Sequence, residues 1–246
     1  MKKKLFINVN CWGSDYIDGL LKYSIPCLSE NLKNINKNEL IRISFFICTN
    51  KSSINRIKKD ISVKKISKII DCKFIEIDSL VNNLKKDTKN KYQLLACVQN
   101  LMINYAKKKN FHFFMTLYPD FIFKKNSLKN LLTIIDKKDC DILVPIPQII
   151  KEEVNKLIKN IGISKVINDL ENINFQFLHD IILNNNINDI KTNTPSLFCQ
   201  IEKKYINFCN YHIHPIIIKL SFNRYKYHPF VKSLDEDFVK SIDYEG

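Results

Sequence analysis

Short apolar runs alternate with segments of helical spacing through the first 150 residues of the chain. The apolar runs cover residues 5–9, 41–48, 111–117 and 142–146, and residues 72–77 are a further strand candidate. Between them, apolar side chains recur every three or four positions at residues 16–28, 53–70, 92–106 and 127–135. Unbroken apolar runs are typical of parallel strands buried on both faces, and their alternation with helices predicts βαβ units. We therefore expect an α/β fold of Rossmann type, with a mostly parallel central sheet and helices on both faces.

The pattern changes after residue 150. Residues 151–190 have a helical pattern rich in Asn, Ile and Lys, whereas residues 197–220 are apolar again. No Gly/Ser-rich linker separates the two parts, and the chain has only four glycines. We interpret residues 1–150 as the α/β core and residues 151–246 as a lobe continuous with it in a single domain.

Composition narrows the class of protein. With 246 residues, of which 45% are hydrophobic, the chain can bury a substantial core. No apolar stretch reaches the roughly 18–20 residues of a membrane span, and the first apolar run is too short for a signal peptide. The eight cysteines include no CxxC pair, which favours buried thiols over disulfides or a zinc ribbon. These features predict a cytoplasmic protein.

The net charge of +14 invites comparison with nucleic-acid-binding proteins. However, only three of the basic residues are arginines, and the lysines are dispersed along the chain. Sequence-specific binding favours arginine forks and a focused basic stripe. We therefore expect a solvated basic surface and no specific nucleic acid, with attraction to an anionic substrate or to the inner face of a membrane as the open alternatives.

Polar residues directly after the apolar runs are the first candidates for a site, because ligands of parallel α/β sheets bind beyond the carboxyl ends of the strands. Tyr118, Pro119 and Asp120 follow the run at residues 111–117. Pro-Asp is ordinary turn chemistry. A carboxylate at that edge would equally suit a hard cation or a ribose hydroxyl. Both interpretations stay open at this point.

A second candidate follows the first apolar run, where Asn10 precedes Trp12, the only tryptophan of the chain. The indole ring would either stack on a base or a sugar or fill part of the core. The sequence contains no GxGxxG, no GxxxxGK[ST] and no GxSxG motif. A dinucleotide fingerprint, a P-loop and a nucleophile elbow are therefore not expected.

Two further candidates lie in the second part. His212 and His214 are two residues apart, so in an extended segment they share a face and form a metal or phosphate pair, unless one of them is simply buried. Asp235 and Asp237 flank Glu236 in a basic chain. These carboxylates either begin a helix, where the dipole favours negative charge, or supply a catalytic base or cation ligands.

Four stretches together resemble one family. They are "NCWGSDYIDGLLKYSIPCLSENL" near the start, "YPDFIFKKNSLKNLL" in the middle, and "YHIHPIII" and "SLDEDFV" toward the end. In this order they are similar to segments of bacterial glycosyltransferase-like proteins of the GT-A, or nucleotide-diphosphosugar transferase, type. The match touches most of the chain and is thin between these stretches.

The resemblance implies a GT-A-like fold and a set of roles. Such enzymes carry an Asp-x-Asp that holds Mn²⁺ or Mg²⁺ against the donor diphosphate, whereas this chain has the single carboxylate of Asp120 there, which puts metal dependence in doubt. The family pattern implies His212 or His214 as a further metal ligand and Asp235 or Asp237 as the base. It also implies donor contacts from the strand ends, by Asn10, Trp12, Thr49, Tyr118 and Asp120.

The function implied is a glycosyltransferase of hexosyltransferase type that uses a nucleotide sugar, with a glycan or a lipid-linked acceptor on the side of residues 151–246. A non-catalytic module that keeps the fold and binds a glycan or partner is the alternative, favoured by the missing carboxylate. A nucleic-acid-binding protein is a third class, which rests on net charge alone.

Overall fold

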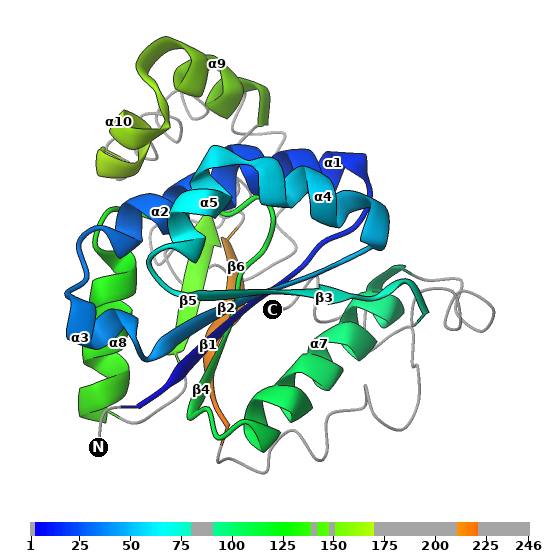
Figure 1. The fold of residues 1–246 in the computed structure, drawn as a ribbon. Coiled ribbons are helices and arrows are strands. Elements are labelled where there is room, and N and C mark those ends of the chain that lie inside the picture. The colour runs from blue at the N-terminus through cyan, green and yellow to red at the C-terminus, as the bar shows by residue number, and fades with distance from the viewer. Residues whose placement is uncertain (1–2, 80–90, 139–141, 148–150, 170–210, 221–246) are drawn as a thin grey trace, which may run out of the picture.

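A six-stranded sheet forms the centre of the computed structural model, which describes residues 3–79, 91–138, 142–147, 151–169 and 211–220 (Figure 1). The strand order is β3-β2-β1-β4-β6-β5. The strands span Leu5–Asn10 (β1), Ile43–Thr49 (β2), Asp71–Glu76 (β3), Phe113–Thr116 (β4), Ile142–Pro147 (β5) and Tyr211–Lys219 (β6). The first four are parallel in the order 3-2-1-4, and β6 runs antiparallel to both β4 and β5.

Helices cover both faces of this sheet, which confirms the predicted α/β fold (Figure 1). One face carries α1 (Ser14–Gly19), the π-helical turn η1 (Leu20–Ser24), α2 (Ile25–Leu32), α4 (Lys51–Lys59), α5 (Ile61–Ser67) and α8 (Ser127–Lys138), with the short α3 (Lys37–Leu40) beside them. The opposite face carries α7 (Lys91–Lys108). Two further helices, α9 (Lys151–Ile161) and α10 (Ile163–Asn168), lie outside the first layer, and α10 contacts α2.

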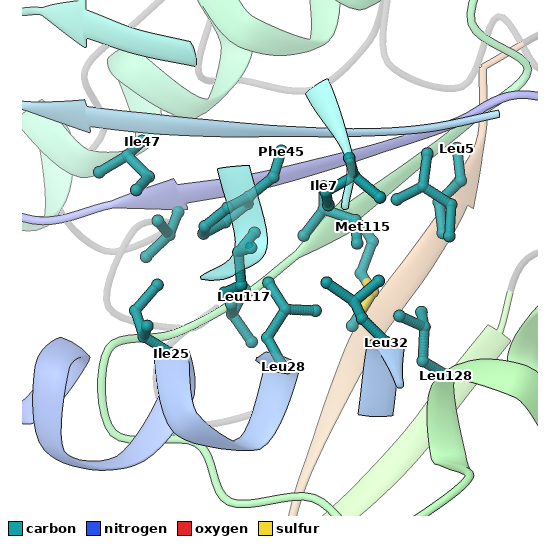
Figure 2. Close-up of a cluster of buried hydrophobic side chains, with 14 of the residues drawn as sticks. Leu5, Ile7, Ile25, Leu28, Leu32, Phe45, Ile47, Met115, Leu117 and Leu128 are labelled. Atoms are coloured by element: carbon teal, nitrogen blue, oxygen red, sulfur yellow. The ribbon is translucent and has the colours of Figure 1, made fainter. Parts of the chain in front are cut away.

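The core divides into two clusters because successive strand side chains point to opposite faces. Leu5, Ile7 and Val9 of β1 join the larger cluster beneath α2 and α8. In Figure 2, Leu28 and Leu32 of α2 point toward the strands of the sheet. On the other face, rings from three adjacent strands stack: Phe6 lies 4.0 Å from Phe46 and 5.4 Å from Phe114, measured between ring centroids.

The helical pattern predicted at residues 16–28 is observed, but the helix changes form within it. The chain stays helical from Ser14 to Leu32 and widens to a π-helix at η1. Pro26 explains the widening, because its ring has no N–H and clashes with the carbonyl four residues earlier in an α-helix. Periodicity alone does not distinguish this turn from an α-helix.

The pattern at residues 53–70 forms two helices, which meet at Asp60. The Asp60 carboxylate accepts hydrogen bonds from the backbone N–H groups of Ser62 (2.8 Å) and Val63 (3.1 Å), which is the geometry of an N-cap. The predicted division between residues 1–150 and 151–246 stays a prediction, because residues 170–210 and 221–246 lie outside the described part of the chain. Within that part, β6 of the second segment lies between β4 and β5 of the first.

Candidate functional site

The sheet reverses its winding between β1 and β4. The connection from β1 to β2 passes through α1, η1, α2 and α3, whereas the connection from β3 to β4 includes α7 on the opposite face. Ligands of open α/β sheets bind outside the carboxyl ends of the strands at such a switch point. Asn8 of β1 pairs with Thr116 of β4, so both strands end at the same edge. This edge is the candidate site.

The residues after β4 form a tight turn at this edge. The Leu117 N–H donates to the Asn8 carbonyl at 2.8 Å, and the Phe121 N–H donates to the Tyr118 carbonyl at 3.3 Å. Pro119 therefore occupies the second position of a β-turn, where its fixed φ is favourable. Pro119 is buried, while Asp120 is exposed. The turn interpretation is thus correct for the backbone, and the carboxylate of Asp120 is accessible to a ligand.

Buried contacts hold this turn against the first helical layer. The Ser24 hydroxyl lies 2.5 Å from the Tyr118 carbonyl oxygen and 3.1 Å from that of Phe121. Gly19 adjoins the same turn, since an added Cβ would lie in ordinary contact, 3.5 Å from the Pro119 carbonyl oxygen. The rings of Tyr118 and Phe121 contact each other with centroids 4.7 Å apart. The segment that contains Asp120 is therefore positioned by the helix that follows β1.

A polar array lies beneath the end of β1 on the α7 face. The Asn8 side-chain amide donates to Asn10 Oδ1 at 2.8 Å, and the Cys48 thiol donates to Asn8 Oδ1 at 3.4 Å. Burial raises the pKa of Cys48 to about 12, so the thiol stays protonated and remains a donor at neutral pH. The Asn10 oxygen accepts from Asn8, and the chemistry of the remaining Asn10 N–H donors suits a hydroxyl, carbonyl or phosphate oxygen of a ligand at the end of β1.

Three further polar residues on the α7 face of the sheet are candidates that the sequence pattern did not predict: Asn8, Thr116 and Gln99. Thr116 ends β4, and its hydroxyl accepts a hydrogen bond from the Gln99 amide of α7 at 3.1 Å. A signal for Asn8 was present in the stretch "LFINVN", where two asparagines recur with period two in an otherwise apolar strand. Gln99 has no comparable signal, since it lies in a long helical pattern.

The other predicted donor contacts differ in accessibility. Thr49 is fully buried, and its hydroxyl lies 3.4 Å from Asn50 Oδ1. A ligand at the end of β2 would therefore meet the half-buried Asn50 before it meets Thr49. Trp12 is also half-buried and packs against the cluster beneath α7. Its ring thus contributes to the core while keeping part of its surface exposed at the edge.

The end of β3 reaches the same edge by way of Asp78. The Asp78 carboxylate accepts a hydrogen bond from the Lys51 N–H at the start of α4, at 2.6 Å. This contact joins the ends of β2 and β3 and places negative charge where the helix dipole favours it. Asp78 is therefore a helix-capping group, with its charge already engaged.

His212 and His214 lie in β6, opposite Ile146 and Val144 of β5. Because β6 is antiparallel to β4 and its pairs with β4 begin at Ile217, its first residues extend past the carboxyl end of β4. The backbone of both histidines thus belongs to the same edge as the turn at Asp120. Asp235 and Asp237 lie outside the described residues. Within the described ranges, no three His, Cys, Asp or Glu side chains gather as a metal site.

Comparisons with known proteins give structural matches alone. No family model matches the chain, and no curated protein matches it. One matching structure is S. aureus TarS, with 16% identity and a TM-score of 0.36 over 56% of this chain and 20% of that chain. A second is S. aureus TarS 1-349, with 17% identity and a TM-score of 0.37 over 57% of this chain and 34% of that chain. Mouse xyloside xylosyltransferase 1 in its apo form also matches, with 10% identity and a TM-score of 0.44 over 100% of this chain and 77% of that chain.

This chain spans 20% and 34% of the two TarS chains that it matches. At these identities and TM-scores, the likenesses carry no conclusion about substrates or catalytic residues.

Proposed function

We propose that this protein is a glycosyltransferase of hexosyltransferase type, which moves a sugar from a nucleotide-activated donor to a glycan or lipid-linked acceptor. The observation that carries the proposal is the switch point between β1 and β4, where the amide of Asn10 ends β1 and the exposed carboxylate of Asp120 follows β4. A site of this kind suits a nucleotide. The resemblance of four sequence stretches to GT-A proteins is the reason for proposing sugar transfer as the reaction.

Roles follow from the chemistry of each group. Asn10 donates hydrogen bonds to the donor nucleotide, and the exposed part of Trp12 offers a surface for a base or a sugar. Tyr118 borders the donor beside the Asp120 turn, and Asp120 accepts from a ribose hydroxyl. Catalysis requires a base that takes the proton of the acceptor hydroxyl. In this proposal Asp235 or Asp237 is that base, and His212 or His214 assists at the phosphates.

A Mn²⁺ or Mg²⁺ ion at Asp120 and the two histidines belongs to the same proposal, where it would stabilise the departing diphosphate. Among the side chains that the structure describes, Asp120 alone belongs to this set, and one carboxylate does not by itself make a cation site. Measuring nucleotide binding with and without Mn²⁺ separates the contribution of the ion from that of the side chains.

Thermal-shift measurements of the full chain with UDP, GDP and CMP, each with and without Mn²⁺, test the proposal. We expect one nucleotide to raise the melting temperature and Asp120→Asn to weaken its affinity by about tenfold, the usual effect of losing a charged hydrogen bond. Asp71→Asn is the matched control, because Asp71 is exposed at the start of β3, on the opposite edge. Indifference to all three nucleotides would contradict the proposal.

The non-catalytic module is separated from the enzyme by donor turnover. The enzyme should hydrolyse or transfer the matching nucleotide sugar, and Asp235→Asn with Asp237→Asn should abolish this turnover while nucleotide binding persists. Nucleotide binding without any turnover in the unmodified chain would favour the module instead.

A further inference from the structure

Residues 51–68, which comprise α4, α5 and Lys68 at the end of α5, carry the strongest local charge in the described part of the chain. They contain seven basic residues and one acidic residue. All seven basic side chains are exposed, whereas the acidic residue, Asp60, is engaged in capping α5. The two helices lie on the same face of the sheet as α1 and α2 (Figure 1). Apart from the Lys51 N–H that binds Asp78, residues 51–68 take no part in the site described above.

The exposed face of α5 has a specific composition. Ile61, Lys64, Lys65 and Lys68 follow one another at spacings of three, one and three, so they share one face of the helix. We call this set the α5 face. The opposite side of α5 is held in the core by Val63 and Ile66, which are 2% and 0% exposed. The core therefore fixes the orientation in which the α5 face meets solvent.

Ile61 is the unusual member of the α5 face, because its side chain is 69% exposed. Lysines in the last turn of a short helix are commonly explained by the helix dipole. That explanation accounts for Lys64 and Lys65, but not for a large apolar side chain placed in solvent among them. Neither lysine forms an ion pair with a carboxylate of the described residues.

We propose that the α5 face binds an anionic lipid surface, with Ile61 inserted at the level of the headgroups. Lysines attract an anionic bilayer through charge, without a fixed hydrogen-bond geometry, and an apolar side chain among them gains by entering the interface. The α5 face thus combines both contributions on one fixed helical surface.

The observations favour lipid over nucleic acid as the partner. Six of the seven basic residues in α4, α5 and the residue that follows are lysines, and the one arginine, Arg56, is ion-paired with Asp18. Neither helix contains an aromatic residue that could stack on a base. A groove for nucleic acid would favour unpaired arginines and exposed rings. The α5 face offers an exposed aliphatic side chain instead.

The arrangement would also orient the molecule. α4 begins directly after β2, at the carboxyl edge that forms the candidate site, and α5 follows it along the same face. α5 ends shortly before β3 begins at Asp71, on the amino edge, so a bilayer on the α5 face would lie beside the helical layer and nearer the amino edge than the candidate site. The lipid proposal does not depend on sugar transfer, because vesicle binding is measured without any nucleotide.

Flotation of the full chain with lipid vesicles tests the proposal. We expect binding to phosphatidylcholine vesicles that contain about 30% phosphatidylserine, and none to phosphatidylcholine alone. The double variant Lys64→Gln/Lys65→Gln should weaken the affinity by about tenfold or more, since each lysine near such a surface contributes substantially. Ile61→Ser should weaken it by roughly threefold or more, through loss of the inserted side chain.

Matched controls lie on α7, on the other face of the sheet. Lys108→Gln/Lys109→Gln removes the same charge from an adjacent exposed pair at a helix end, and Leu101→Ser removes a side chain that is 49% exposed. Both should retain vesicle affinity within about twofold, the residual effect of net charge. Circular dichroism confirms that each variant is folded.

Three results would overturn the proposal. The first is no binding to anionic vesicles. The second is an equal loss of vesicle affinity in Lys64→Gln/Lys65→Gln and in Lys108→Gln/Lys109→Gln, which would show that net charge alone causes the binding. The third is tighter binding of a fluorescent single-stranded RNA that is lost in Lys64→Gln/Lys65→Gln, which would assign the α5 face to nucleic acid.

Discussion

Asn8 and Asn10 differ in burial and in hydrogen bonding although they lie two residues apart on one strand. Asn8 is fully buried and bonded on both sides, whereas Asn10 is 9% exposed at the strand end. Asn8→Ala leaves two buried partners without their hydrogen bonds, so we expect a loss of about 1–3 kcal/mol in the free energy of unfolding. Urea denaturation measures this loss.

Asn10→Ala should instead lower nucleotide affinity by about tenfold, the effect of one lost hydrogen-bond donor, and cost less stability than Asn8→Ala. Thermal shift with the nucleotide that stabilises the unmodified chain measures the affinity. If nucleotide affinity persisted in Asn10→Ala, the Asn10 amide would have no part in the donor site.

At the scale of single residues, the sequence predicted positions better than it predicted contacts. Asn10, Trp12, Tyr118 and Asp120 were named because polar groups follow apolar runs, and each lies at the carboxyl edge of the sheet. The hydrophobic pattern could not predict which side chains contact these residues. The bond from Asn8 to Asn10 and the contact of Ser24 with the Asp120 turn depend on side-chain geometry across 2 and 94 residues.

At the scale of elements, the helix after β1 determines where the Asp120 turn lies. Ser24→Ala removes the hydroxyl that contacts two carbonyls of this turn, so we expect a loss of about 1–2 kcal/mol in stability and weaker nucleotide binding. Gly19→Leu should act in the same direction, because a large side chain would displace the Pro119 backbone. Denaturation and thermal shift measure the two effects.

Gly19→Ala is the control for this prediction. Its Cβ would make ordinary contact at 3.5 Å, and Gly19 has a helical φ of −58°. Since alanine favours a helix over glycine by about 1 kcal/mol, this variant should be neutral or slightly more stable. Unchanged nucleotide affinity in Gly19→Leu would show that the turn and the ligand are independent.

The sequence predicted the type of most elements, because hydrophobic periodicity reports burial directly. The strand at residues 111–117 is shorter in the structure, since β4 spans Phe113–Thr116 and the turn begins soon afterward. The antiparallel insertion of β6 between β4 and β5 was not predicted. An apolar run indicates a strand, but its direction and its neighbours are set by contacts remote in sequence.

At the scale of the whole molecule, the described part of the chain contains no helix long and apolar enough to cross a bilayer. The two edges of the sheet carry different groups. Asn10 and Asp120 lie at the carboxyl edge, whereas Arg42 joins several elements at the amino edge. The Arg42 guanidinium donates to both carboxylate oxygens of Asp136 on α8 at 2.7 and 2.8 Å, and to the Lys3 carbonyl at 2.9 Å. It also pairs with Glu39 on α3.

This division predicts that stability and ligand binding respond separately to substitution. Arg42 is 6% exposed, so Arg42→Met would remove the guanidinium that binds both carboxylate oxygens of Asp136 and the Lys3 carbonyl, and cost about 3 kcal/mol in the free energy of unfolding. Arg56→Met is the control, because its pair with Asp18 is exposed and should contribute less than about 1 kcal/mol. Urea denaturation measures both variants.

Nucleotide affinity, measured below the melting temperature of each variant, should stay unchanged in Arg42→Met, since the guanidinium lies at the edge opposite Asp120. A loss of affinity in Arg42→Met as large as that in Asp120→Asn would mean that the two edges are coupled. The carboxyl ends of the strands would then not form a separate binding edge.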